Sequence, residues 1–135
     1  MDEMTVRVPV TVKSKLTEAL RTKLLGEIAQ NLDRVERDMS QLEFQGKGML
    51  AEQAKVNAQG MIAIRAQLEQ KKLQMEQVKS QLTKDKEHLE KLAVGAEIPR
   101  GQWERIVTIH VGDDVNHLLA GEILVEDGKV IAFRD

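Results

Sequence analysis

Cysteine and tyrosine are absent from this 135-residue chain, and its only aromatic residues are Phe44, Trp103 and Phe133. Without cysteine there are no disulfides, no thiol catalysis and no thiolate metal sites. The hydrophobic content of 41% consists almost entirely of aliphatic residues, which suits helix seams better than a large globular core. We therefore expect a small globular part that carries a long helical extension.

The chain also lacks a strong net charge and a long apolar run. Its 20 Lys and Arg against 22 Asp and Glu give a net charge of −2, so no overall basic field indicates nucleic-acid binding. No apolar run approaches the roughly 18 residues of a membrane-spanning helix. The start, MDEMTVRVPV, is acidic where a signal peptide would be basic. These features predict a cytoplasmic protein with no membrane partner.

Alternating valines predict a first strand over about residues 4–12, from Val6 to Val12. Pro9 has no N–H, so this strand should lie at a sheet edge or carry a bulge. Ser14 is the expected N-cap of the helix that follows.

Residues 13–93 have heptad-like periodicity. Leu25, Leu32 and Met39 fall at a positions and Ile28, Val35 and Leu42 at d positions. The same register continues through Gly46, Met49, Gln53 and Val56. A second segment places Met61, Leu68, Met75, Leu82 and Leu89 at a, and Ile64, Lys71, Val78, Asp85 and Leu92 at d.

Two glycine-containing stretches compete as the turn of an antiparallel hairpin. A turn at Asn57–Gly60 makes facing residue numbers add up to 117, which places Val35 opposite Leu82 and most other layers apolar on apolar. A turn at Gly46–Gly48 would leave no apolar seam. We therefore predict an antiparallel coiled-coil hairpin with its turn at about 57–60.

The preferred register has three imperfect layers, in which Leu32 faces Asp85, Gln53 faces Ile64, and Gly46 faces Lys71. We interpret Lys71 and Asp85 as polar residues that fix the register of the seam. Gly46 and Gly48 form a candidate flexible point of the arm, either as weak continuous helix or as a kink.

The last third of the chain predicts the rest of a small sheet. Gly95 and Pro99 should end the second helix. Strands are expected at about 103–111, 122–126 and 129–134, with Trp103, Val107, Ile109 and Val111 on one face and a helical turn at about 114–119 capped by Asp113 or Asp114. Asp127-Gly128 is typical of a two-residue type I′ hairpin turn.

The predicted fold class is therefore α+β. A long antiparallel helical hairpin, residues 13–93, is inserted between the first strand and the last three strands of a small β-sheet base, residues 1–12 and 94–135. Leu16, Leu20 and Leu24 have no partner on the second helix in this register, and we expect them to pack at the base.

This order of elements, with GAEI at Gly95–Ile98, HVGD at His110–Asp113 and the closing EDGKVIAFRD, resembles the YlqD-like family of small bacterial proteins. The family has no established biochemical function or active site, so the resemblance assigns no residue a role. It implies a translation-linked setting, because genes of the family often lie near genes for ribosome maturation and tRNA modification.

The sequence shows no catalytic signature, neither a phosphate-binding glycine motif nor a nucleophile–His–Asp pattern. In HVGDDVNH, His110 and His117 flank Asp113 and Asp114, which are residue types that bind metals. A strand histidine, a capping aspartate and an outward-facing histidine account for these residues better than a metal site does. We therefore predict a protein that is not an enzyme and has no cofactor, no metal and no small-molecule substrate.

Charge separates the second helix from the base. Residues 61–93 hold seven basic and five acidic residues, net +2, whereas residues 94–135 hold four and eight, net −4. The candidate contacts for a partner or for RNA are Lys71, Lys72, Lys79, Lys84, Lys86 and Lys91. Two functions follow: an interaction or scaffold module that docks its arm to a protein or to itself, and an RNA- or ribosome-associated factor that uses the basic second helix.

Overall fold

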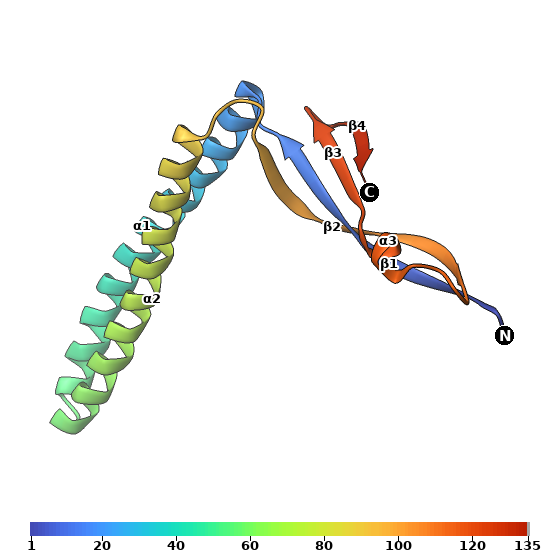
Figure 1. Cartoon of the computed structure of the whole chain (residues 1–135). Coiled ribbons are helices and arrows are strands. Elements are labelled where there is room, and N and C mark those ends of the chain that lie inside the picture. Colours follow the sequence, from blue (N-terminus) through green and yellow to red (C-terminus); the bar gives the residue numbers. More distant parts are fainter. Residues whose placement is uncertain (135) are drawn as a thin grey trace. The chain divides into compact units, whose positions relative to one another are not determined.

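The computed structural model describes residues 1–134, which divide into two compact units. One unit contains Met1–Thr22 together with the described residues from Leu92 onward, and the other contains Lys23–Lys91. The chain runs from a first strand into two long helices and returns to three further strands (Figure 1). This element order confirms the predicted α+β class, with a helical hairpin between the first strand and the last three.

The strands form a four-stranded sheet in the order β2-β1-β3-β4 within the described residues. The bounds of the strands are Glu3–Lys15 for β1, Glu97–His110 for β2, Glu122–Glu126 for β3 and Lys129–Arg134 for β4. β1 pairs antiparallel with β2 and parallel with β3, while β3 pairs antiparallel with β4. The chain passes from β2 to β3 through the short helix α3, Val115–Leu119.

β1 and β2 are both longer than the predicted 4–12 and 103–111. Their ladder extends to Lys15 opposite Glu97, and two further hydrogen bonds continue it, from Leu16 N to Ala96 O at 2.7 Å and from Gly95 N to Leu16 O at 2.8 Å. Backbone pairing does not require apolar side chains, so the polar ends of these strands gave no alternating signal. Pro99 consequently lies inside β2, next to a bulge where the register shifts.

The predicted N-cap at Ser14 is wrong, because Ser14 is paired within β1. Thr17 caps the first long helix instead: its Oγ1 accepts a hydrogen bond from Leu20 N at 3.1 Å. The difference follows from the longer β1, which consumes the residues that were assigned to the start of the helix.

Pro9 lies where β1 has an open edge. β3 pairs only with Thr11–Ser14, and the N–H of Thr11 points to that side, where it donates to Gly121 O at 3.2 Å. Since backbone groups of a strand alternate in direction, the nitrogen of Pro9 points to the same side, beyond the end of β3. The expectation of an edge is therefore confirmed at Pro9, although β1 becomes an inner strand two residues later, at Thr11.

The apolar core of the first unit lies along one face of β1. Val8, Val10 and Val12 are buried, and Leu16 is completely inaccessible to solvent. Of the four apolar residues predicted to share one face of β2 and the segment after it, Val107 and Ile109 are only half-buried, whereas Trp103 and Val111 are exposed. The face predicted for this part of the chain is therefore mostly solvated, because few described residues cover it.

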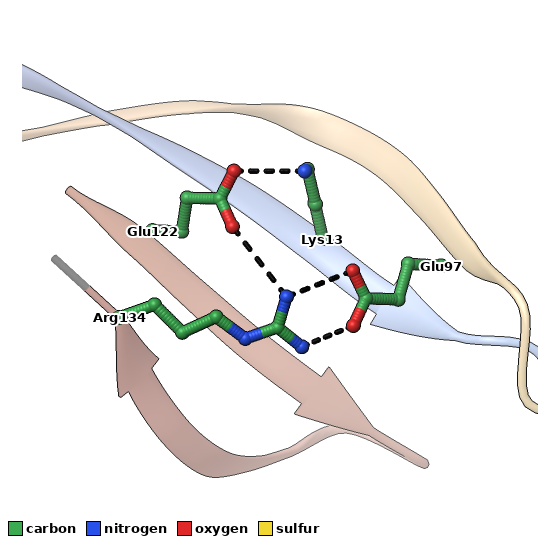
Figure 2. A network of polar contacts seen from close by, with 4 residues as sticks. All are labelled: Lys13, Glu97, Glu122 and Arg134. Carbon is green, nitrogen blue, oxygen red and sulfur yellow. Dashed lines mark hydrogen bonds and ion pairs between the residues drawn. The ribbon is translucent and has the colours of Figure 1, made fainter. Parts of the chain in front are cut away.

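One polar side chain from each of the four strands contributes to a network on the sheet (Figure 2). Arg134 of β4 donates from both terminal nitrogens to the carboxylate of Glu97 on β2, with 2.9 Å between Nη1 and Oε2. Glu122 of β3 lies 2.7 Å from Lys13 Nζ of β1 and 3.6 Å from Arg134 Nη1. Charge-assisted, bidentate bonds of this kind fix strand positions as well as adding stability.

The hydrogen bonds from Arg134 hold the pKa of Glu97 below its usual value of 4.5. A carboxylate with a lowered pKa in the folded state stabilises the fold above its unfolded pKa, and that stability is lost as the pH falls through the folded pKa. We expect the free energy of unfolding of Glu97→Gln to fall less steeply than that of the wild type on acidification below about pH 4.5.

Urea denaturation at a series of pH values measures this difference. The matched control is Glu104→Gln, because Glu104 is exposed and lies 3.9 Å from Arg7, and it should keep the wild-type slope. Parallel curves for Glu97→Gln and the wild type would contradict the predicted role of this network.

The connection between β3 and β4 has the predicted geometry. Asp127 has φ of 49° and Gly128 has φ of 81°. Two successive positive φ values are the requirement of a type I′ turn, which explains Asp-Gly at these positions.

The two long helices are α1, Glu18–Ala54, and α2, Ala58–Lys91. α1 continues through Gly46 and Gly48. The sequence allowed either continuous helix or a kink at these two glycines, and the structure has continuous helix. Asn57 caps α2 by accepting a hydrogen bond from Gly60 N at 2.6 Å. The turn therefore comprises Lys55–Asn57 and not 57–60, and Gly60 lies within α2.

Within the first unit, a hydrogen bond joins the start of α1 to the residue that follows α2. The guanidinium of Arg21 donates to Leu92 O, just beyond α2, at 2.7 Å. Gly95 follows with φ of 94°, four residues after α2 ends at Lys91. Gly95 therefore lies in the link to β2 and does not cap the last helical turn.

Candidate interaction surface of the helical hairpin

The register of the two helices differs from the predicted one. A Cβ placed on Gly46 would lie 2.9 Å from Leu68 Cδ1, so Gly46 packs against Leu68 and not opposite Lys71. Farther from the turn, Lys79 Nζ lies 3.4 Å from Glu36 Oε1. The numbers of these facing residues add up to 114 and 115, where the prediction required 117.

The earlier turn accounts for this shift of about three residues along α2. Lys71, Val78 and Asp85, the predicted d positions in the middle of α2, are exposed, whereas the a positions Met61, Leu68, Met75 and Leu82 are half-buried. Lys79 is half-buried as well and takes part of the inward face that was assigned to Val78. Lys71 and Asp85 therefore do not fix the register of the seam.

Most of the apolar seam remains partly open to solvent. Within α1 and α2, which the structure describes in full, only Gly46 and Leu89 are buried. The half-buried apolar residues of α1 include Leu25, Ile28, Leu32, Val35, Met39, Leu42 and Leu50. Each helix has one neighbour in the hairpin, so a flank of every seam side chain stays uncovered.

One flank of the hairpin forms a groove of about 450 Å³. Its apolar floor consists of Met39, Leu42, Gly46, Leu50 and Leu68. Gly46 is buried, and its lack of a side chain lets Leu68 pack directly against α1. We call these five residues the groove floor.

Charged residues line both sides of the groove floor. We define the α1 rim as Glu36, Glu43 and Lys47, and the α2 rim as Glu69, Lys72 and Lys79. Within the α1 rim, Lys47 Nζ lies 3.8 Å from Glu43 Oε1. An apolar floor between charged rims is a common arrangement of a surface that binds another polypeptide.

The six candidate lysines do not form one cluster. Lys72 and Lys79 lie on the α2 rim, whereas Lys71, Lys84, Lys86 and Lys91 are exposed and do not line the groove. From Lys71 to Lys91 the helix rises about 30 Å. The lysines are therefore dispersed along α2.

Gly48, the second residue of the candidate flexible point, is exposed with open space around it.

The residues considered for a metal have other partners. His110 Nε2 lies 3.1 Å from Glu3 Oε2, and Asp113 accepts a hydrogen bond from His110 N at 2.7 Å. Asp114 caps α3 through Asn116 N at 2.9 Å. Among residues 1–134, no group of three or more His, Asp or Glu side chains is placed to hold a metal ion.

Another hollow, which the sequence did not predict, lies in the first unit. Val10, Trp103, Ile123 and Phe133 border a shallow depression of about 280 Å³. Trp103 and Phe133 are 57% and 79% exposed, which is high for two of the three aromatic residues in the chain. The indication in the sequence was that aromatic residues are rare in this chain, so the position of each of them needed an explanation.

Comparison with known proteins identifies the family of this chain. The pattern of the YlqD protein family matches residues 4–134. The chain belongs to the YlqD family. The uncharacterized protein YlqD of Bacillus subtilis (strain 168) is 30% identical over 126 residues, which cover 93% of this chain and 94% of that protein.

A solved structure shares the YlqD-family fold described above. The crystal structure of a protein of unknown function from Synechococcus sp. WH 8102 superposes with a TM-score of 0.87, at 21% sequence identity. The match covers 98% of this chain and 95% of that one. At this identity the likeness concerns the fold alone.

No helix in the described part of this YlqD-family chain is long and apolar enough to cross a membrane.

The position of Gly46 against Leu68 can be tested with two alanine substitutions. Gly48→Ala should stabilise the protein by roughly 0.5–1 kcal/mol, because a helix prefers Ala and the added Cβ meets nothing within 4 Å. Gly46→Ala should gain less, since Leu68 must move to accept the methyl group. Urea denaturation of both variants measures the difference, and equal gains would contradict the observed register.

Proposed function

We propose that this protein is a non-enzymatic interaction module whose helical hairpin is a coiled-coil arm that docks to another polypeptide chain. The first unit, which contains the four strands, is connected to both ends of this arm. The expected compartment is the cytoplasm. The observation that carries this proposal is the groove: an apolar floor with charged rims on a hairpin whose seam is largely half-buried.

Burial energetics support this function. Removing apolar surface from water contributes roughly 25 cal/mol per Å², so a helix pair that leaves its seam half-exposed retains unused stabilisation. A partner helix laid along the groove would cover the same side chains that the two helices cannot cover for each other. Met39 and Met75, both half-buried, have flexible side chains that adapt to such a partner.

The absence of a catalytic arrangement is consistent with docking but is not its basis. The groove contains carboxylates and ammonium groups, yet among its lining residues no nucleophile and base stand in a catalytic relation. Ser40 is the one hydroxyl that lines the groove, and no histidine lines it. The proposal therefore requires recognition by shape and charge alone.

Photo-crosslinking in the native cytoplasm tests the docking function. A photoreactive amino acid at Lys47, on the α1 rim, should give a discrete crosslinked product with a polypeptide. The same probe at Gln41, which is exposed on α1 and outside the groove, is the matched control and should give at least tenfold less. Equal products at both positions, or none, would contradict docking through the groove.

An RNA- or ribosome-associated function is the alternative, and a specific feature favours it. Lys71, Lys84, Lys86 and Lys91 project into solvent along α2. Lysines spaced along a helix can contact successive phosphates without reading bases.

This alternative predicts RNA binding that weakens steeply with salt. Replacing Lys84, Lys86 and Lys91 by Gln should lower the slope of log affinity against log salt by about 1 for each lysine. Filter binding or fluorescence anisotropy with total cellular RNA fragments measures the slope. A matched variant with Lys23 and Lys47 of α1 and Lys55 of the turn replaced by Gln should keep the slope, and salt-independent binding would exclude the alternative.

A further inference from the structure

The two rims of the groove carry opposite charges at the three levels where charged residues line it. Facing residues have numbers that add up to 114 or 115, as Gly46 and Leu68 and the pair Glu36 and Lys79 show. The same rule places Glu43 at the level of Lys72. Lys47 is then level with Glu69, to within about one residue, which is roughly 1.5 Å along a helix.

We infer that the occupant of the groove is the same groove of a second copy of this chain, in a two-fold symmetric four-helix arrangement. This inference deepens the proposed docking function and rests on it. A half turn about an axis parallel to the helices lays the α2 rim of one copy over the α1 rim of the other. The groove floors of the two copies then face each other.

Charge complementarity supports a second copy as the occupant. Within one chain Lys79 lies 3.4 Å from Glu36 and Lys47 lies 3.8 Å from Glu43. In this arrangement Glu36 also meets the partner's Lys79, Glu43 meets the partner's Lys72, and Lys47 meets the partner's Glu69. Symmetry repeats each pair, so every rim charge meets its opposite. An interface between identical copies requires such a self-complementary surface, and most protein surfaces lack it.

The same charges disfavour a partner of one charge sign. A nucleic acid placed in the groove would bring phosphates toward Glu36, Glu43 and Glu69, which lie among the basic residues of the two rims. A uniformly acidic or basic helix would meet three like charges as well. The mixed pattern therefore favours the second copy over a polyanion or polycation.

Apolar burial would supply the attraction. Met39, Leu42, Leu50 and Leu68 are half-buried in the single chain, so each keeps an apolar flank that a partner side chain can cover. In a four-helix arrangement each helix gains a second neighbour, so these side chains reach the core that a two-helix hairpin cannot form.

Sedimentation equilibrium over protein concentrations from micromolar to millimolar provides the primary test. The wild type should show a reversible monomer–dimer equilibrium. A monomer at every concentration would overturn the inference, and a trimer or larger closed assembly would overturn the two-fold arrangement.

Charge reversal identifies the surface. One variant makes the rims acidic by Lys47→Glu, Lys72→Glu and Lys79→Glu, and the other makes them basic by Glu36→Lys, Glu43→Lys and Glu69→Lys. Each variant alone should dimerise at least tenfold more weakly than the wild type. An equimolar mixture of the two should form a one-to-one heterodimer, because acidic rims then meet basic rims.

The mixing experiment separates association from folding. Circular dichroism before mixing shows whether each variant keeps its helices, and recovery on mixing can arise only between chains. The matched control is Lys71→Glu with Lys84→Glu and Lys86→Glu. It changes the net charge by the same amount as the acidic variant, but outside the groove, and should dimerise like the wild type. Failure of the folded variants to pair, or equal weakening by the control, would overturn the groove as the interface.

The outcome also distinguishes this inference from the proposed function. A monomeric wild type whose Lys47 probe crosslinks to a different protein would overturn the second copy and leave docking in place. A monomeric wild type with no crosslinked product would remove both.

Discussion

The backbone pairing of β1 with β2 is the constraint on which the rest of this structure depends. Its ladder runs from Glu3 opposite His110 to Lys15 opposite Glu97, and both helices of the arm lie between these strands in the sequence. The chain must therefore return to the place it left, which two antiparallel helices of 37 and 34 residues accomplish. Local helical contacts lessen the entropy cost of closing so long a connection. Once β1 is fixed, it aligns β3, and the four-strand network joins β4 to the same sheet.

The hairpin is long but only two helices wide, and this width limits how much of its apolar seam can be covered. Two helices in contact have one shared side, so additional turns extend the seam but never enclose it. The half-buried apolar residues are consequently a property of the architecture. On the flank that forms the groove, acidic and basic residues are mixed along both rims, beside the close contact of Gly46 with Leu68.

The fold is kept at low sequence identity because it depends on the pattern and size of residues and not on their exact identity. The Synechococcus structure superposes over nearly the whole chain with 21% of residues identical. Apolar spacing, helix caps and a turn with two positive φ values tolerate many residue choices, provided that size and pattern are kept. The rim charges are not needed for any of these features.

The sequence by itself determined the features that depend on local periodicity and turn chemistry. Alternating valines gave β1, heptads gave two helices, and Asp127-Gly128 gave the β3–β4 turn, because each pattern is read within a few residues. The tertiary structure alone decided the relative register of the helices, since capping by Asn57 moved the turn and brought Gly46 against Leu68 instead of Lys71. It alone also decided that β1 includes Ser14 and that Lys79 lines the groove. A heptad repeats every seven residues, so a slip of a few residues keeps apolar residues near the seam and changes only their partners. Which residues face each other, and so the groove itself, depends on contacts between segments far apart in the chain, and no local pattern encodes those contacts.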